Sequence, residues 1–269
     1  MFLGLDISIE QLLVVSLSPI VLALVCIGGP IIISVLGLKI TRKLIPANVL
    51  KEHHDVAGAM LGALGTIYGI FLAFIVATTW QYYSTTASNV DDEARCIGNL
   101  YTNADAFTPA FRDTIQSNLR NYRDTLVNEE WKELARGQSS RKAEKLLHEL
   151  SKEYMTYKII NPVEEAFFNE SVRNLNMLKQ LRMDRLADAT TGLIPLLWIV
   201  LVVGAIATIG FTFLFATHSL YAQVIMTVLF AGVIALTLYT IVNLDFPFSG
   251  MVAIPPDSLT RLDLGPTTP

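Results

Sequence analysis

Three long stretches of this chain carry no Asp, Glu, Lys or Arg, and they constrain the fold more than any other feature. They cover residues 11–38, 56–90 and 189–244. A bilayer core is about 30 Å thick and needs about 20 apolar residues in a helix, so each of the first two stretches can cross it once. The third is twice too long for one crossing, and "ATHSLYAQ" interrupts it. We therefore expect four spans, near residues 12–38, 57–80, 192–215 and 221–244.

The composition supports a membrane protein. Of the 269 residues, 52% are hydrophobic and 16% are charged, and the mean hydropathy is +0.46. The first ten residues lack Lys and Arg, and no small-residue cleavage site follows, so a cleaved signal peptide is not expected. Gly28-Gly29-Pro30 predicts a kink or a break in the first span. Cys26 and Cys96 lie in an apolar and a polar segment, so no disulfide is expected.

The polar part of the chain lies between the second and third spans. Residues 81–190 hold 15 of the 20 Lys and Arg and 17 of the 24 Asp and Glu. Helix starts are predicted at Thr108-Pro109, at Ser140 and at the Asn161-Pro162-Val163-Glu164 capping sequence, and Gly137 is suited to end a helix. These signals indicate a helical bundle domain that can continue the ends of the second and third spans.

Charge near the spans does not decide the orientation in the membrane. The loop after the first span offers Lys39, Arg42, Lys43 and Lys51. The opposite side offers Arg95, Arg173, Lys179, Arg182, Arg185 and Arg261. Long loops follow the positive-inside rule poorly, so both orientations stay open.

No sequence signature of an enzyme or of a bound cofactor is present. The chain has no Gly-rich phosphate loop, no HExxH and no CxxC. His53-His54 is a poor metal pair, because adjacent helical residues point about 100° apart. Glu129-Glu130 and Glu164-Glu165 are expected on solvated helix faces. The predicted spans carry no Asp, Glu, Lys, Arg or His, which argues against a proton-coupled carrier and is compatible with a passive pore, a scaffold or a sensor.

The second span has two different faces. Bulky side chains, including Ile67, Phe71 and Phe74, lie opposite a stripe of small residues. The stripe consists of Gly58, Gly62, Gly65, Gly69 and Ala73. Small residues let another helix approach closely. The bulky face either meets lipid or, if several copies surround an axis, forms an apolar constriction that gates ions by dewetting. Periodicity alone does not choose between the two.

Four features resemble the bestrophins, and more closely the bestrophin-like family of bacterial membrane proteins of unknown function. The first is the layout of two spans, a helical domain, two spans and a tail. The second is "IYGIFLAFIVATTWQYY" (residues 67–83), and the third is "LIPLLW" (residues 193–198). The fourth is Pro247-Phe248-Ser249-Gly250, which stands where bestrophins have Pro-Phe-Gly after the last span.

The resemblance implies an all-α membrane protein that forms a homo-oligomer, pentameric in bestrophins, around a central ion pore. It implies a pore neck at Ile67 and Phe71, with Phe74 or Ile75 one turn further on. It also implies that the protein lies in a bacterial inner membrane, with its helical domain on the cytoplasmic side. In animal bestrophins an acidic run that helps hold calcium follows the Pro-Phe-Gly. Here Asp245 and the distant Asp257 are a poor cage for calcium, so no metal site is expected.

The predicted domains are the first two spans (residues 1–80), the soluble helical domain (81–190), the last two spans (191–244) and the C-terminal tail (245–269). We interpret Asp245, Pro247, Phe248 and Gly250 as a fold signature that stops the last helix, and we expect its rings to pack against the helical domain or a neighbouring subunit. The function expected is an ion channel or channel-like protein whose partners are membrane lipid, small inorganic ions and its own copies, without nucleic acid. The alternative is a membrane-anchored interaction or sensing module that does not conduct.

Overall fold

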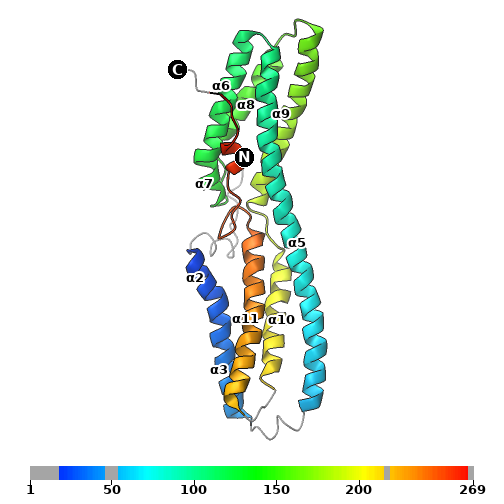
Figure 1. Ribbon diagram of the computed structural model, residues 1–269, viewed down its shortest axis with the longest axis vertical. Coiled ribbons are helices and arrows are strands. Elements are labelled where there is room, and N and C mark those ends of the chain that lie inside the picture. The colour runs from blue at the N-terminus through cyan, green and yellow to red at the C-terminus, as the bar shows by residue number, and fades with distance from the viewer. Residues whose placement is uncertain (1–17, 46–53, 215–218, 266–269) are drawn as a thin grey trace. The chain divides into compact units, whose positions relative to one another are not determined.

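The computed structural model describes residues 18–45, 54–214 and 219–265, and these residues form helices and connections without any strand (Figure 1). The chain divides into two compact units. The spanning unit consists of Ile9–Tyr82 and Gly192–Asp245, and the helical unit contains Tyr83–Thr191 and the chain from Phe246 onward.

Four helices in the described residues are long and apolar enough to cross a membrane, as the sequence predicts. They cover Ile20–Leu44, Gly58–Ala106, Pro195–Thr212 and Leu220–Asp245. The expected start of the first span lies outside the described residues. Its helix continues to Leu44 rather than ending near residue 38, so Lys39, Arg42 and Lys43 are helical instead of lying in a loop.

The first span changes its helical geometry where the sequence predicts a kink or a break. It consists of α2 (Pro19–Ala23), the π-helical turn η1 (Leu24–Gly28) and α3 (Gly29–Leu44). Pro30 has no N–H to donate, and a π-helical turn is one way in which a helix accommodates such a position. The predicted irregularity is therefore a wider turn before Pro30, and helical residues follow it directly.

Close helix packing holds the spanning unit together. Its other helices are α10 (Pro195–Thr212), α11 (Leu220–Asp245) and the first part of α5 (His54–Asn103). A Cβ atom added at Gly37 would lie 2.8 Å from the Phe213 ring, so this glycine lets the ring approach α3. Some buried hydroxyl groups bond within their own helix: Ser34 Oγ donates to Ile31 O at 2.8 Å. Such a hydroxyl group needs no partner from another helix.

The helical unit begins with the last part of α5, so it is continuous with the second span. Several shorter helices follow α5 in this unit. Because α9 ends at Asp188 and α10 begins at Pro195, the unit does not continue the third span as a single helix. The elements are η2 (Ala104–Ala106), α6 (Pro109–Thr125), η3 (Leu126–Glu130), α7 (Trp131–Leu134), α8 (Arg141–Thr156), α9 (Pro162–Asp188) and α12 (Asp257–Thr260).

The predicted helix starts in this unit are confirmed. Ser140 Oγ accepts the N–H of Ala143 at the start of α8, and Asn161 Oδ1 accepts the N–H of Glu164 at 2.9 Å. The Glu164 carboxylate accepts from the N–H of Ile160 and from the hydroxyl of Tyr157, both at 3.0 Å. Glu164 is only 6% exposed, so the prediction of a solvated position was wrong for this residue. Its carboxylate closes the turn before α9.

The chain that follows the last span packs into the helical unit. Leu259 and Leu264 are buried in its main core. Two arginines of α6 bind the same segment through its backbone: Arg120 Nη1 donates to Leu264 O at 3.2 Å, and Arg123 Nη1 donates to Leu262 O at 2.9 Å. These described tail residues are therefore part of the domain's core.

Candidate functional site

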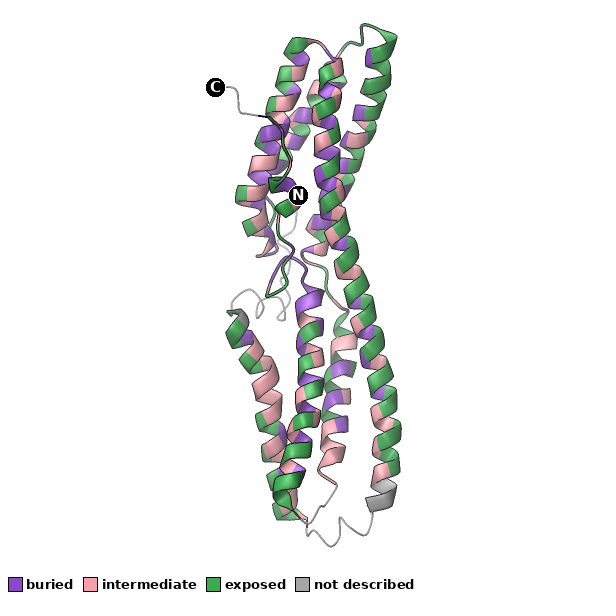
Figure 2. Ribbon diagram, in the orientation of Figure 1, coloured by how far each residue is buried: buried purple, intermediate pink, exposed green. Residues whose placement is uncertain are grey.

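One side of α5 is buried within the spanning unit and the other is exposed (Figure 2). Tyr68, Leu72 and Ile75 are buried in its apolar core. Ile67 and Phe74, seven residues apart and so on one side of the helix, are 69% and 65% exposed. An exposed strip of large apolar side chains on a spanning helix must meet lipid or another protein surface.

The structure separates the predicted neck residues into three environments. Ile67 and Phe74 share the exposed side. Phe71 is half-buried and packs against the core of the spanning unit. Ile75 is 3% exposed inside that core. The protomer therefore brings Ile67 and Phe74 together on an open face and encloses Ile75.

The small-residue stripe lies open along much of its length. A Cβ atom added at Gly62, Gly65 or Gly69 would meet no atom within 4 Å, Ala73 is exposed, and Gly58 is partly buried. In the part of the chain that the structure describes, no helix of the same protomer packs closely against these three glycines. The stripe is thus free to receive something from outside the protomer.

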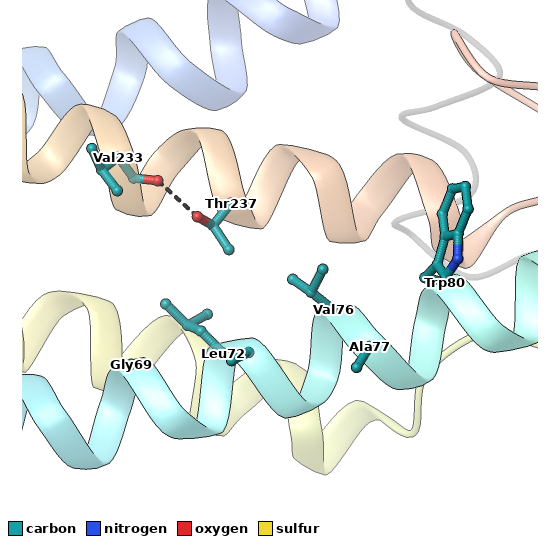
Figure 3. Close-up of a pocket in the computed structure, with 8 residues that line it drawn as sticks. Gly69, Leu72, Val76, Ala77, Trp80, Val233 and Thr237 are labelled. Atoms are coloured by element: carbon teal, nitrogen blue, oxygen red, sulfur yellow. Dashed lines mark hydrogen bonds between the residues drawn. The ribbon is translucent and has the colours of Figure 1, made fainter.

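An open groove of about 610 Å³ runs between α5 and α11 (Figure 3). Leu72 and Val76 of α5 lie on one side of it, facing Val233 and Thr237 of α11. The Thr237 hydroxyl already donates to Val233 O at 2.9 Å, so the lining offers little to a charged ligand. The full lining is Gly69, Leu72, Ala73, Val76, Ala77, Trp80, Val233 and Thr237.

The helical unit contains a cluster of four buried charges. Arg185 of α9 binds Glu93 of α5 through Nε, at 2.7 Å, and through Nη2, at 3.1 Å. The same Nη2 donates to Glu130 at 2.8 Å. Arg182 completes the cluster with bonds of 3.2 and 2.7 Å to Glu130. Glu130 is fully buried, so the prediction of a solvated position was wrong for this residue too.

The two positive and two negative charges of the cluster balance, and all four side chains are buried from solvent. Burial alone would raise the pKa of Glu130, but the Arg185 and Arg182 guanidinium groups outweigh it and lower that pKa. Burial opposes the charge of Arg185, yet Glu93 and Glu130 hold its pKa above the ordinary value. The Arg185 guanidinium lies 4.9 Å from the centre of the Trp131 ring. Arg182 and Arg185 are therefore structural cations and not surface charges that orient the protein in a membrane.

Sequence reasoning missed this cluster, although one signal was present. Arg182 and Arg185 are three residues apart on α9, on the side that carries Leu178 and Leu181, which are also buried. Two cations within an apolar stripe indicate that buried acids must lie opposite them, because unpaired buried charges are costly. The sequence does not show which acids these are.

The segment after the last span is anchored at both ends of its turn. Asp245 Oδ1 accepts the N–H of Leu193 at 2.8 Å within the spanning unit. In the helical unit, the buried Phe248 ring meets Trp131 edge-on at 5.8 Å, and Ser249 Oγ donates to Ala135 O at 3.0 Å. Gly250 has a φ of 79°, which favours glycine. The expected packing of the Phe248 ring against the helical domain is confirmed.

No group of three or more His, Cys, Asp or Glu side chains that could hold a metal ion occurs among the described residues. His53 lies outside them. The features that stand out are therefore the exposed side of α5, the groove beside it and the structural anchors of the helical unit.

These features define a helical integral membrane protein with the bestrophin fold. The family model of the Bestrophin-like domain matches residues 28–259, and the chain belongs to this family. A crystal structure of a bacterial bestrophin homologue from Klebsiella pneumoniae, in a point-mutant form, superposes with a TM-score of 0.66 at 15% identity, over 87% of this chain and 96% of that chain. Another structure of the homologue gives a TM-score of 0.63 at 16% identity, over 86% and 93%. No curated protein matches the chain.

Proposed function

We propose that this protein is a homo-oligomeric ion channel, with a pentamer as the favoured assembly, whose neck is formed by the exposed side of α5. The observation that carries the proposal is the exposure of Ile67 and Phe74 on one side of α5 in a protein of the bestrophin-like family. One copy of α5 cannot enclose a pore. Several copies around an axis would bring these side chains together.

The open small-residue stripe supports an oligomer. Gly58, Gly62, Gly65, Gly69 and Ala73 present little side-chain volume, so a helix of another copy can approach closely. The groove beside Gly69 and Ala73 extends the same surface toward α11. In a bilayer, close contacts of this kind are a main source of helix association.

The neck would act as an apolar gate. A ring of Ile67 side chains and a ring of Phe74 side chains would exclude water when narrow and admit hydrated ions when wide. Phe71 lies between them in sequence. It would contribute to the neck only with the part of its ring that is not buried in the core. None of the three side chains carries charge, so the neck itself does not select the sign of the ion.

We also propose a bacterial inner membrane as the location and the cytoplasm as the side of the helical unit. The support is the similarity to homologues from Klebsiella pneumoniae and the resemblance of the chain to bestrophins. Protease protection of inside-out and right-side-out vesicles would determine the side.

Flux from purified protein in liposomes tests the channel. We expect chloride or potassium flux above that of empty liposomes, and faster flux from Phe74→Ala because one apolar ring of the proposed neck loses its bulky side chains. Ile206→Ala on α10 is the matched control, because Ile206 is 67% exposed on a spanning helix outside the neck. Absence of flux from both the parent and Phe74→Ala, with oligomers intact, would refute the channel.

A second function is favoured by a different observation. Apolar side chains are exposed around the α8–α9 connection of the helical unit, including Met155 at 82%, Ile160 at 69% and Val163 at 63%. Exposed apolar clusters in a polar domain are typical of contact surfaces. A membrane-anchored interaction module predicts a stoichiometric partner that is lost when Ile160 and Val163 are both changed to Ser. If the protein is only a channel, the double Ser variant should conduct like the parent and no bound partner should be lost.

A further inference from the structure

A tyrosine lies in the middle of the second span and is buried. The Tyr68 side chain is 6% exposed within the core of the spanning unit. Its hydroxyl donates to the carbonyl oxygen of Leu201 on α10 at 2.8 Å. A phenylalanine would supply the same apolar ring, and a buried hydroxyl without a partner is costly in hydrocarbon. The hydroxyl therefore fixes the position of the ring against α10.

Gly204 gives this ring its place. A Cβ atom at Gly204 would lie 2.5 Å from Cε2 and 2.6 Å from Cδ2 of Tyr68, a distance that real contacts do not show. Gly204 is nearly one turn of α10 beyond Leu201, which accepts the hydrogen bond. The ring is thus held at two points on α10, one by shape and one by a directional bond.

This contact sets the rotation of α5 about its own axis. Consecutive helical residues point about 100° apart, so the direction of Tyr68 determines that of Ile67. Phe71 is about 60° from the direction of Tyr68, and Phe74 is about 120° from it. With Tyr68 held against α10, Ile67 and Phe74 face outward and Phe71 remains half in the core.

We propose that Tyr68 and Gly204 act as a rotational lock that determines which side chains of α5 face the neck. The lock itself is a contact within one protomer and does not depend on the proposed channel function. Only its effect on a pore neck rests on that function. Tyr68 is a positioning residue, and its effect on ions is exerted through Ile67, Phe71 and Phe74. Release of the lock would let α5 turn about its axis and change the composition of the neck.

A nitroxide scan of α5 tests the lock without any assumption about ion flux. Cys26 and Cys96 are first changed to Ala, and single nitroxide labels are placed at positions 66–74, omitting 68. Accessibility to oxygen in a bilayer then oscillates along the helix, and the phase of the oscillation reports its rotation. Gly204→Ala fills the place of the ring. Gly210→Ala on the same helix is the matched control, because a Cβ there meets nothing within 4 Å.

We expect Gly204→Ala to shift the phase by about 30° or more, roughly a third of the rotation between neighbouring residues, and Gly210→Ala to leave it unchanged. Tyr68→Phe keeps the ring and removes only the hydrogen bond, so it provides the test if Gly204→Ala does not fold. It should shift the phase in the same direction by less. An unchanged phase in the folded variants would overturn the lock.

Flux measured on the same variants separates the two proposals. If the phase shifts and no variant conducts, the lock stands and the channel fails. If the parent conducts and the phase does not shift, the channel stands and the lock fails. A shift accompanied by altered flux in Tyr68→Phe supports both.

Discussion

The helical unit buries a cluster of two arginines and two glutamates, whereas the spanning unit buries mainly hydroxyl and amide groups between its ends. Thr208 Oγ1, for example, donates to Gly204 O within its own helix at 2.6 Å. A hydroxyl satisfied in this way depends on no other helix. Each buried charge, in contrast, depends on side chains from other elements. The units therefore differ in what a single substitution can remove: a local bond in one, a shared cluster in the other.

The largest effect is expected from Arg185→Met. Removal of this guanidinium leaves the buried Glu93 without its arginine and Glu130 with Arg182 alone, which costs about 3–5 kcal/mol. Denaturant unfolding in detergent, followed by circular dichroism, measures the loss. Arg173→Met is the control, because Arg173 pairs with Glu170 at 3.5 Å on the surface and should cost less than about 1 kcal/mol. Similar losses in the two variants would show that burial of the cluster contributes little.

A somewhat smaller effect is expected from Phe248→Ala. The ring is 5% exposed and packs against Trp131, so truncation should cost about 3 kcal/mol of stability in the helical unit. We also expect a weaker oligomer, which mass photometry in detergent would show. Val252→Ala, at a site that is 39% exposed, should change neither quantity noticeably. A destabilised protein with an unchanged oligomer would restrict the role of Phe248 to folding.

Thr208→Val tests the other side of the comparison. The substitution removes a buried hydroxyl and keeps the shape of the side chain, so the loss should stay below about 1 kcal/mol. The same unfolding measurement applies. A loss as large as that of Arg185→Met would mean that the hydroxyl has a partner in another helix, and would remove the contrast between the units.

The last prediction concerns the titration of Glu130, which changes stability in acid and not near neutral pH. Its pKa is lowered in the folded protein, so the unfolded chain binds the proton first. The stabilisation is therefore complete above the unfolded pKa of about 4.3 and is lost as pH falls through the lower folded value. Unfolding as a function of pH should show this loss, and Glu130→Gln should reduce the slope. Equal slopes would exclude Glu130 as the titrating group.

The parts of the fold that follow from local chemistry could be predicted. Four apolar helices follow from charge-free runs of sufficient length, and the helix starts at Ser140 and Asn161 follow from capping side chains that act within one turn. The bounds were less predictable: α5 continues far beyond the apolar run, because its polar residues Glu93 and Asn99 are also compatible with a helix.

The parts that depend on several helices could not be predicted. Glu130 and Glu164 look like solvated acids, because the sequence shows their charge and not the partners that folding brings to them. Periodicity separates α5 into faces. Which face is buried against α10 depends on the packing of the Tyr68 ring against Gly204, and the sequence does not show this contact. The predicted neck and the small-residue stripe stay predictions that concern contacts between copies of the chain.

The packing of the final segment has a consequence for how the protein is made. Phe248, Ile254, Leu259 and Leu264 fill the core of a unit whose first helices are synthesised much earlier. Domains begin to fold during synthesis, at about 5–20 residues per second. This one stays incomplete while the ribosome produces the last two spans, with Trp131 and Leu134 uncovered. Membrane insertion of α10 and α11 thus precedes maturation of the helical unit, which would need protection from aggregation during that interval.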